Sequence, residues 1–101
     1  MSEAAPFALD GDLTVFAVAE LKDQLLQALA QRACLTIDAS AVSEVDGAGI
    51  QLLLATKKEA ERHGKSMRLH AASKQLLEAL DLTDLRAELY AESADSMECP
   101  A

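Results

Sequence analysis

The sequence predicts a single α/β domain, in which helices pack on a mixed β-sheet of about four to five strands. Three observations lead to this fold class. The chain has 101 residues, the size of one domain, and half of them are apolar, enough to form a packed core. Apolar runs of strand length alternate with segments of helical period. Over residues 34–71 a strand, a helix and a strand follow one another, which is typical of a βαβ unit with parallel strands.

Two short strands are expected at the start of the chain, Phe7–Leu9 and Leu13–Val15. Asp10-Gly11-Asp12 lies between them, and glycine adopts the positive φ of a tight hairpin. We therefore expect this pair to be antiparallel, and its pairing is what would make the sheet mixed.

A helix is predicted over residues 18–30, because apolar residues recur there with the helical period. Its apolar face consists of Val18, Leu21, Leu25, Ala28 and Leu29.

The central βαβ unit consists of a strand over 34–38, a helix over 47–63 and a strand over 66–71. Gly64 is suited to end the helix, and apolar and polar residues alternate in the second strand. From the helical period we expect Leu53 to face the sheet and Leu52 to lie on the outer face.

The last part of the chain contains a short helix over 73–80, with Ser73 as its N-cap. Residues 82–90 fit either a helical turn or a last strand. The core of the domain is expected to end near residue 90, and residues 91–101 are predicted to form a flexible acidic tail.

The net charge of −8 argues against nucleic acid and anionic lipid as partners, because both attract basic surfaces. The longest apolar run is too short to span a bilayer, and the first residues contain no basic segment of a secretory signal. Cys34 is expected to be a small buried side chain, and the two cysteines form no C-x-x-C pair. These features favour a cytoplasmic protein with free thiols.

The segment SEVDGAGIQLLLA, residues 43–55, holds an acidic, glycine-containing turn before an apolar helix. Three interpretations remain open. Asp46 is suited to cap the helix, Gly47 and Gly49 would let a partner backbone approach, and the turn could cradle a phosphate. The phosphate is the least favoured, because Glu44 and Asp46 would repel it and no lysine follows.

The sequence offers little for catalysis or cofactor binding. His63 and His70 have no further ligand at metal-binding spacing. Asp38 and Asp46 could approach each other, but carboxylates at such places usually act as caps. We therefore expect no enzyme activity, no metal and no cofactor.

The stretch from Leu35 to Ser73 resembles the centre of a STAS domain, the fold of anti-sigma factor antagonists. The residues that carry the resemblance are the strand ending in Asp38, the Val45-Asp46 pair, Gly49, the apolar helix and the later LEALDLTDL. In phosphoregulated members, the two positions after the aspartate carry Ser or Thr. Here they are Gly47 and Ala48, so the resemblance implies a domain without phosphorylation at this site, although Ser40 and Ser43 lie just upstream.

The resemblance implies a non-catalytic module that binds another protein, such as an anti-sigma kinase or a chemotaxis-associated signalling protein. The expected contact residues are Ser43, Asp46, Gly47, Ala48, Gly49, Gln51 and Leu52. Two alternatives remain: a domain that binds a nucleotide or lipid, and an accessory subunit of a lipid-transport ABC complex. The oligomeric state is not predicted.

Overall fold

The computed structural model of the chain describes residues 7–9 and 11–89. The described elements, in chain order, are β1 (Phe7–Ala8), β2 (Gly11–Leu13), α1 (Val18–Ala30), β3 (Cys34–Ala39), β4 (Val42–Val45), α2 (Gly47–Arg62), β5 (Ser66–Ala72), α3 (Lys74–Leu82) and α4 (Arg86–Leu89). The ambiguous segment 82–90 thus contains a helical turn rather than a strand. Tyr90 and the predicted acidic tail lie outside the described residues.

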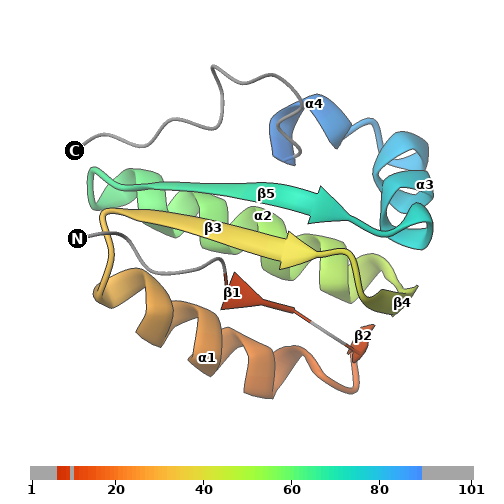
Figure 1. Cartoon of the computed structure of the whole chain (residues 1–101), viewed down its shortest axis with the longest axis horizontal. Helices are drawn as coiled ribbons and strands as arrows, with labels where there is room; N and C mark the ends of the chain where they lie inside the picture. Colours follow the sequence, from red (N-terminus) through yellow and green to blue (C-terminus); the bar gives the residue numbers. More distant parts are fainter. Residues whose placement is uncertain (1–6, 10, 90–101) are drawn as a thin grey trace.

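Every strand pairing among the described residues is parallel. β3 lies between β1 and β5 in a three-stranded sheet, and β2 pairs with β4 in a separate two-stranded sheet (Figure 1). The pairing of β3 with β5 across α2 confirms the predicted βαβ unit.

The predicted N-terminal hairpin is wrong. Gly11 does have a positive φ of 85°, as the turn signal indicated. However, β1 and β2 do not pair with each other, because β1 pairs with β3 and β2 pairs with β4. The two short strands therefore join different sheets, and the expected antiparallel component of a mixed sheet is not formed by them.

A second difference lies between β3 and α2, where the sequence predicted no strand. Residues Val42–Val45 form β4, which carries one buried side chain, Val42. The strand has only four residues, and its two polar residues stand together between the valines, so it shows no alternating β pattern. Its pairing with β2 brings the start of α2 beside the end of β2.

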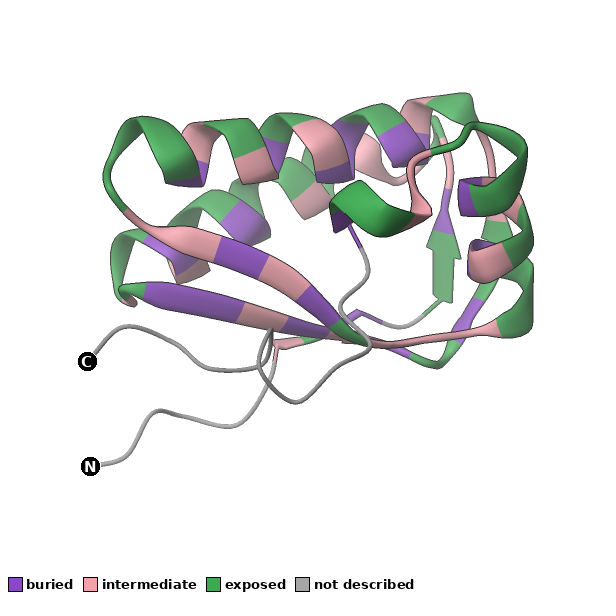
Figure 2. Cartoon of the chain, turned by 90° about the horizontal axis from the view of Figure 1, so that it is seen from above, coloured by how far each residue is buried: buried purple, intermediate pink, exposed green. Residues whose placement is uncertain are grey.

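Helices α1 and α2 cover one face of the three-stranded sheet (Figures 1 and 2). α1 contacts β3, α2 contacts β5, and the two helices also pack against each other. α3 packs on β4 at the end of the strands, and α4 contacts α2 and α3. None of the helices in the described ranges has the length and apolar composition needed to cross a membrane.

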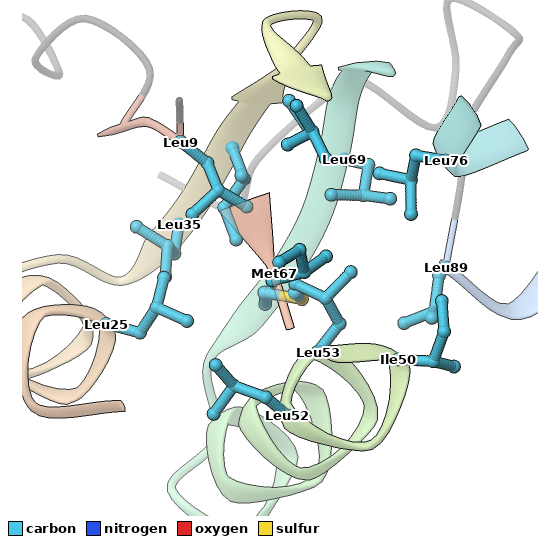
Figure 3. Close-up of a cluster of buried hydrophobic side chains, with 14 of the residues drawn as sticks. Leu9, Leu25, Leu35, Ile50, Leu52, Leu53, Met67, Leu69, Leu76 and Leu89 are labelled. Carbon is cyan, nitrogen blue, oxygen red and sulfur yellow. The ribbon is translucent and has the colours of Figure 1, made fainter. Parts of the chain in front are cut away.

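The core lies between the sheet and these helices (Figure 3). Its leucines are largely shielded from solvent, and Leu53 of α2 is fully buried as predicted. The predicted apolar face of α1 is confirmed, because Leu25 and Leu29 are buried and Val18, Leu21 and Ala28 pack partly against the core. In β5, Met67 and Leu69 are buried and His70 is exposed, as the predicted alternation requires, whereas Arg68 and Ala71 are both half-buried.

Leu52 is buried, with only 8% of its surface exposed, so its predicted place on the outer face is wrong. The prediction considered only the sheet as a neighbour of α2. Because α1 also packs against α2, the buried part of the helix is wider than one face of the sheet requires. Figure 3 shows Leu52 and Leu53 leaving α2 in different directions.

Cys34 is buried, as expected for a small apolar side chain. The prediction of free thiols is wrong for this residue, which is disulfide-bonded. The other cysteine of the chain, Cys99, lies outside the described residues.

Candidate functional site

The turn at the start of α2 is organised by the side chain of Asp46. Its Oδ1 accepts a hydrogen bond of 3.0 Å from the backbone N–H of Gly49, and its backbone is extended. This geometry confirms the predicted N-cap. The cap uses only one of the two carboxylate oxygens, which leaves the second for another contact.

That second oxygen, Oδ2, accepts a hydrogen bond of 3.0 Å from the backbone N–H of Val15. The N–H of Asp46 in turn donates to the carbonyl oxygen of Leu13 at 3.1 Å. Asp46 therefore ties the end of β2 to the start of α2. The N–H groups of Val15 and then Gly49 hold the pKa of the Asp46 carboxyl below its usual value, although partial desolvation acts in the opposite direction.

The two glycines of the turn have different surroundings. Gly49 is buried against β2, and a Cβ placed on it would overlap the carbonyl oxygen of Leu13 and lie 2.6 Å from its Cγ. Gly47 is exposed, and a Cβ there would meet nothing within 4 Å. The close backbone approach predicted at Gly49 is thus made by this chain's own β2, and Gly47 is the glycine that leaves open space.

The other expected contact residues divide by burial. Gln51 and Ser43 are exposed, Asp46 and Ala48 are half-buried, and all four lie near the turn in the chain. Leu52 is covered by the protein itself. The surface that the turn offers to another molecule therefore consists of Ser43, Asp46, Gly47, Ala48 and Gln51, which we call the turn surface.

The two serines upstream of the turn, Ser40 and Ser43, both donate hydrogen bonds to carboxylates. The hydroxyl of Ser40 donates to Oδ1 of Asp38 at 2.7 Å, and that of Ser43 donates to Oδ1 of Asp12 at 3.1 Å. The Ser40 hydroxyl and backbone N–H also hold the pKa of the Asp38 carboxyl below its usual value. A phosphate on either serine would stand beside a negative charge.

Sequence reasoning missed two exposed apolar side chains beside the turn surface. Val15 is 55% exposed and Phe16 is 97% exposed. They lie in a tight turn closed by a hydrogen bond of 2.9 Å from the N–H of Ala17 to the carbonyl of Thr14. The sequence had placed Val15 in a strand, and the segment contains none of the residues that usually mark a turn. No local signal could have shown that Phe16 faces solvent.

A shallow groove of about 500 Å³ lies beside Phe16. It is formed by the β2–α1 turn, by β4 and the start of α2, and by the first turns of α3. Its described lining is Asp12, Thr14, Phe16, Ser43, Glu44, Val45, Asp46, Gln75 and Glu78. The groove and the turn surface share Ser43 and Asp46, so they form one continuous region of the surface.

Neither histidine lies in a ligand cluster. His63 contacts the carboxylate of Glu59 at 2.9 Å on the surface of α2, and this contact holds the pKa of Glu59 below its usual value. Among residues 7–9 and 11–89, no group of three His, Cys, Asp or Glu side chains could hold a metal ion.

Fold and site together define a small α/β domain that presents a capped helix start at the end of its strands. A family model described as "Mlab, STAS domain" matches residues 2–90. The chain belongs to this STAS family, which confirms the resemblance found in the sequence.

A solved structure supports the same fold. The chain is similar to "Structure of the Anti-Sigma Factor Antagonist SpoIIAA in its Unphosphorylated Form", with a TM-score of 0.69 and 17% sequence identity. The alignment covers 94% of this chain and 88% of that one. At this identity the likeness shows the fold alone. No match was found among curated proteins.

Proposed function

We propose that this STAS domain is a non-catalytic regulatory module that binds another protein through the turn surface. The observation that carries the proposal is the hydrogen bonding that orders this surface. Asp46 fixes it with hydrogen bonds to two separate segments, and Gly47 leaves its outer side open. A surface that is ordered before binding loses little conformational entropy when a partner docks.

The partner is a protein of bacterial signalling, such as an anti-sigma factor or a chemotaxis-associated regulator. Membership of the STAS family and the likeness to an anti-sigma factor antagonist support this assignment. The same membership is compatible with an accessory role in a lipid-transport complex, which also requires protein binding.

The turn is not switched by phosphorylation at the usual site, because neither Gly47 nor Ala48 has a hydroxyl. Ser40 and Ser43 are poor substitutes, since their hydroxyls already donate to Asp38 and Asp12. The domain is therefore always in its binding-competent form.

The test is a single substitution in the turn. Gly47→Gln adds a long side chain where a Cβ meets nothing within 4 Å, so the fold should be retained and partner binding should be blocked. Partners are captured from the source cell with the wild-type domain, identified by mass spectrometry, and their affinity for both forms is measured.

Ala30→Gln provides the matched control, because Ala30 is exposed at the last turn of α1, at the other end of the molecule from the turn surface (Figure 1). This variant should bind as the wild type does. If Gly47→Gln is folded and binds every captured partner with unchanged affinity, the turn surface is only a helix cap and the proposal is wrong.

A further inference from the structure

Phe16 is the most exposed large apolar side chain in the described part of the molecule, at 97%. It does not lie on a loose segment. The turn that carries it is closed by the Ala17–Thr14 hydrogen bond, and the N–H of Val15 is bonded to Asp46. An aromatic side chain on a fixed turn can be buried by a partner at a small cost in entropy, which is why such residues are frequent at the centres of interfaces.

The groove beside Phe16 has a single sign of charge. Four carboxylates line it, those of Asp12, Glu44, Asp46 and Glu78, and the described lining contains no Lys, Arg or His. The Asp46 and Asp12 carboxylates are fixed by hydrogen bonds to the N–H of Val15 and the hydroxyl of Ser43. The region thus combines an exposed aromatic side chain with oriented negative charge.

We propose that Phe16 and the acidic groove receive a basic segment of the partner protein. An apolar side chain of that segment packs on Phe16 and Val15, and its Lys or Arg side chains lie against the groove carboxylates. This inference rests on the proposed function, because the groove continues into the turn surface. The inference adds that the bound segment of the partner is basic and that Phe16 anchors it.

The physical argument combines two different contributions. Burial of Phe16 supplies affinity, because an aromatic side chain removes a large apolar area from water. The carboxylates supply selection, since they attract cationic segments and repel acidic ones at short range. The net charge of −8 extends the same preference to the approach of the partner.

The binding test uses three synthetic peptides of about 12 residues, the length of an extended or helical recognition segment. The first alternates Arg and Leu with Ser spacers, the second carries Glu in place of Arg, and the third carries Ser in place of Leu. Each is titrated into the 15N-labelled full chain, and amide shifts are followed by NMR. The Arg/Leu peptide should shift the amides of Val15, Phe16, Ser43 and Glu78 and bind roughly tenfold more tightly than the other two.

Two variants locate the binding. Phe16→Ser and Glu78→Lys should each weaken the Arg/Leu peptide roughly tenfold, while the melting temperature stays near that of the wild type because both side chains are exposed. The matched controls are Leu82→Ser, at the end of α3 with 88% exposure, and Glu61→Lys, near the end of α2. Both controls should bind as the wild type does. Peptide shifts spread over the whole surface, equal binding of the Glu peptide, or unchanged binding by Phe16→Ser would each overturn the inference.

The same variants separate this inference from the proposed function once a partner has been captured. If Gly47→Gln abolishes binding of the partner and Phe16→Ser does not, the turn surface binds the partner and the groove inference is wrong. If both variants abolish it and the bound segment is basic, the inference holds. If neither affects it, both proposals fail.

Discussion

Gly47 and Gly49 occupy the same turn, two positions apart, but only Gly49 is required by the packing. A side chain on Gly49 would collide with the backbone of Leu13. Gly49→Ala should therefore lower the free energy of unfolding by about 1–3 kcal/mol or more, the usual cost of overpacking. Gly47→Ala should leave it unchanged or raise it by up to about 1 kcal/mol, because alanine is the better helix former. Urea denaturation of both variants measures the difference.

The two variants should differ in the sign of their effect on the free energy of unfolding. Both substitutions add one methyl group to the first turn of α2, so helix propensity alone would make both stabilising. Equal effects would show that β2 moves away from α2 without cost.

At the residue scale, the sequence predicted what depends on neighbours in the chain. The caps Asp46 and Ser73 were found because a capping side chain bonds to an N–H three positions later, as both do here. The second role of Asp46 could not be predicted, because Val15 is 31 positions away in the sequence. Phe16 was missed for a similar reason, since its exposure depends on a turn held by that distant contact.

At the scale of the element, α2 has two apolar side chains that differ in their neighbours. Leu53 is fully buried and Leu52 is 8% exposed, so Leu53→Ala and Leu52→Ala should each lower the free energy of unfolding by about 2–5 kcal/mol. Gln51→Ala provides the exposed control and should stay within about 0.5 kcal/mol of the wild type. Chemical denaturation measures all three variants. A surface-like value for Leu52→Ala would mean that α1 does not cover this side of α2.

The helices were more predictable than the strand pairings. α1 and α2 both have long periodic patterns, α2 also has the Asp46 cap, and the bounds of both helices agree closely with the predicted ranges. The pairing of β1 and β2 was predicted wrongly, because Asp10-Gly11-Asp12 is a turn signal and a turn does not by itself specify a hairpin. β4 was missed because its sequence, VSEV, has no alternating pattern. It forms a strand because it pairs with β2, which is distant in the sequence.

At the scale of the whole molecule, three carboxylates make stability dependent on pH. The pKa values of Asp38, Asp46 and Glu59 are all held below their ordinary values in the folded protein, chiefly by hydrogen bonds from Ser40, Val15 and His63. At a pH between the folded-state and unfolded-state pKa values, the unfolded chain therefore binds more protons than the folded protein does. This contribution should be fully present above about pH 5 and be lost as the pH falls through the lower, folded-state values. Urea midpoints measured from pH 6 to pH 3 should fall accordingly.

Asp46→Asn tests whether the Asp46 carboxylate contributes to this loss of stability at acidic pH. The amide oxygen can still cap Gly49, but the amide nitrogen cannot accept a hydrogen bond from Val15. The variant should be less stable than the wild type at pH 6 and should lose less further stability by pH 3. A parallel decline of the two proteins would assign the acid sensitivity to other carboxylates.

The long-range parallel pairings have a consequence for the order of folding. Phe7 pairs with Ile37, and Leu13 pairs with Val45, so neither N-terminal strand has a partner until the chain beyond it has been synthesised. During translation, β1 and β2 are synthesised first and stay unpaired until the later strands β3 and β4 have emerged from the ribosome. Closing such long loops costs conformational entropy before the strand pairing stabilises the chain. This domain should therefore fold more slowly than a helical bundle of equal length. Stopped-flow refolding would show a rate governed by the docking of β1 and β2, and substitutions in β2 would slow it.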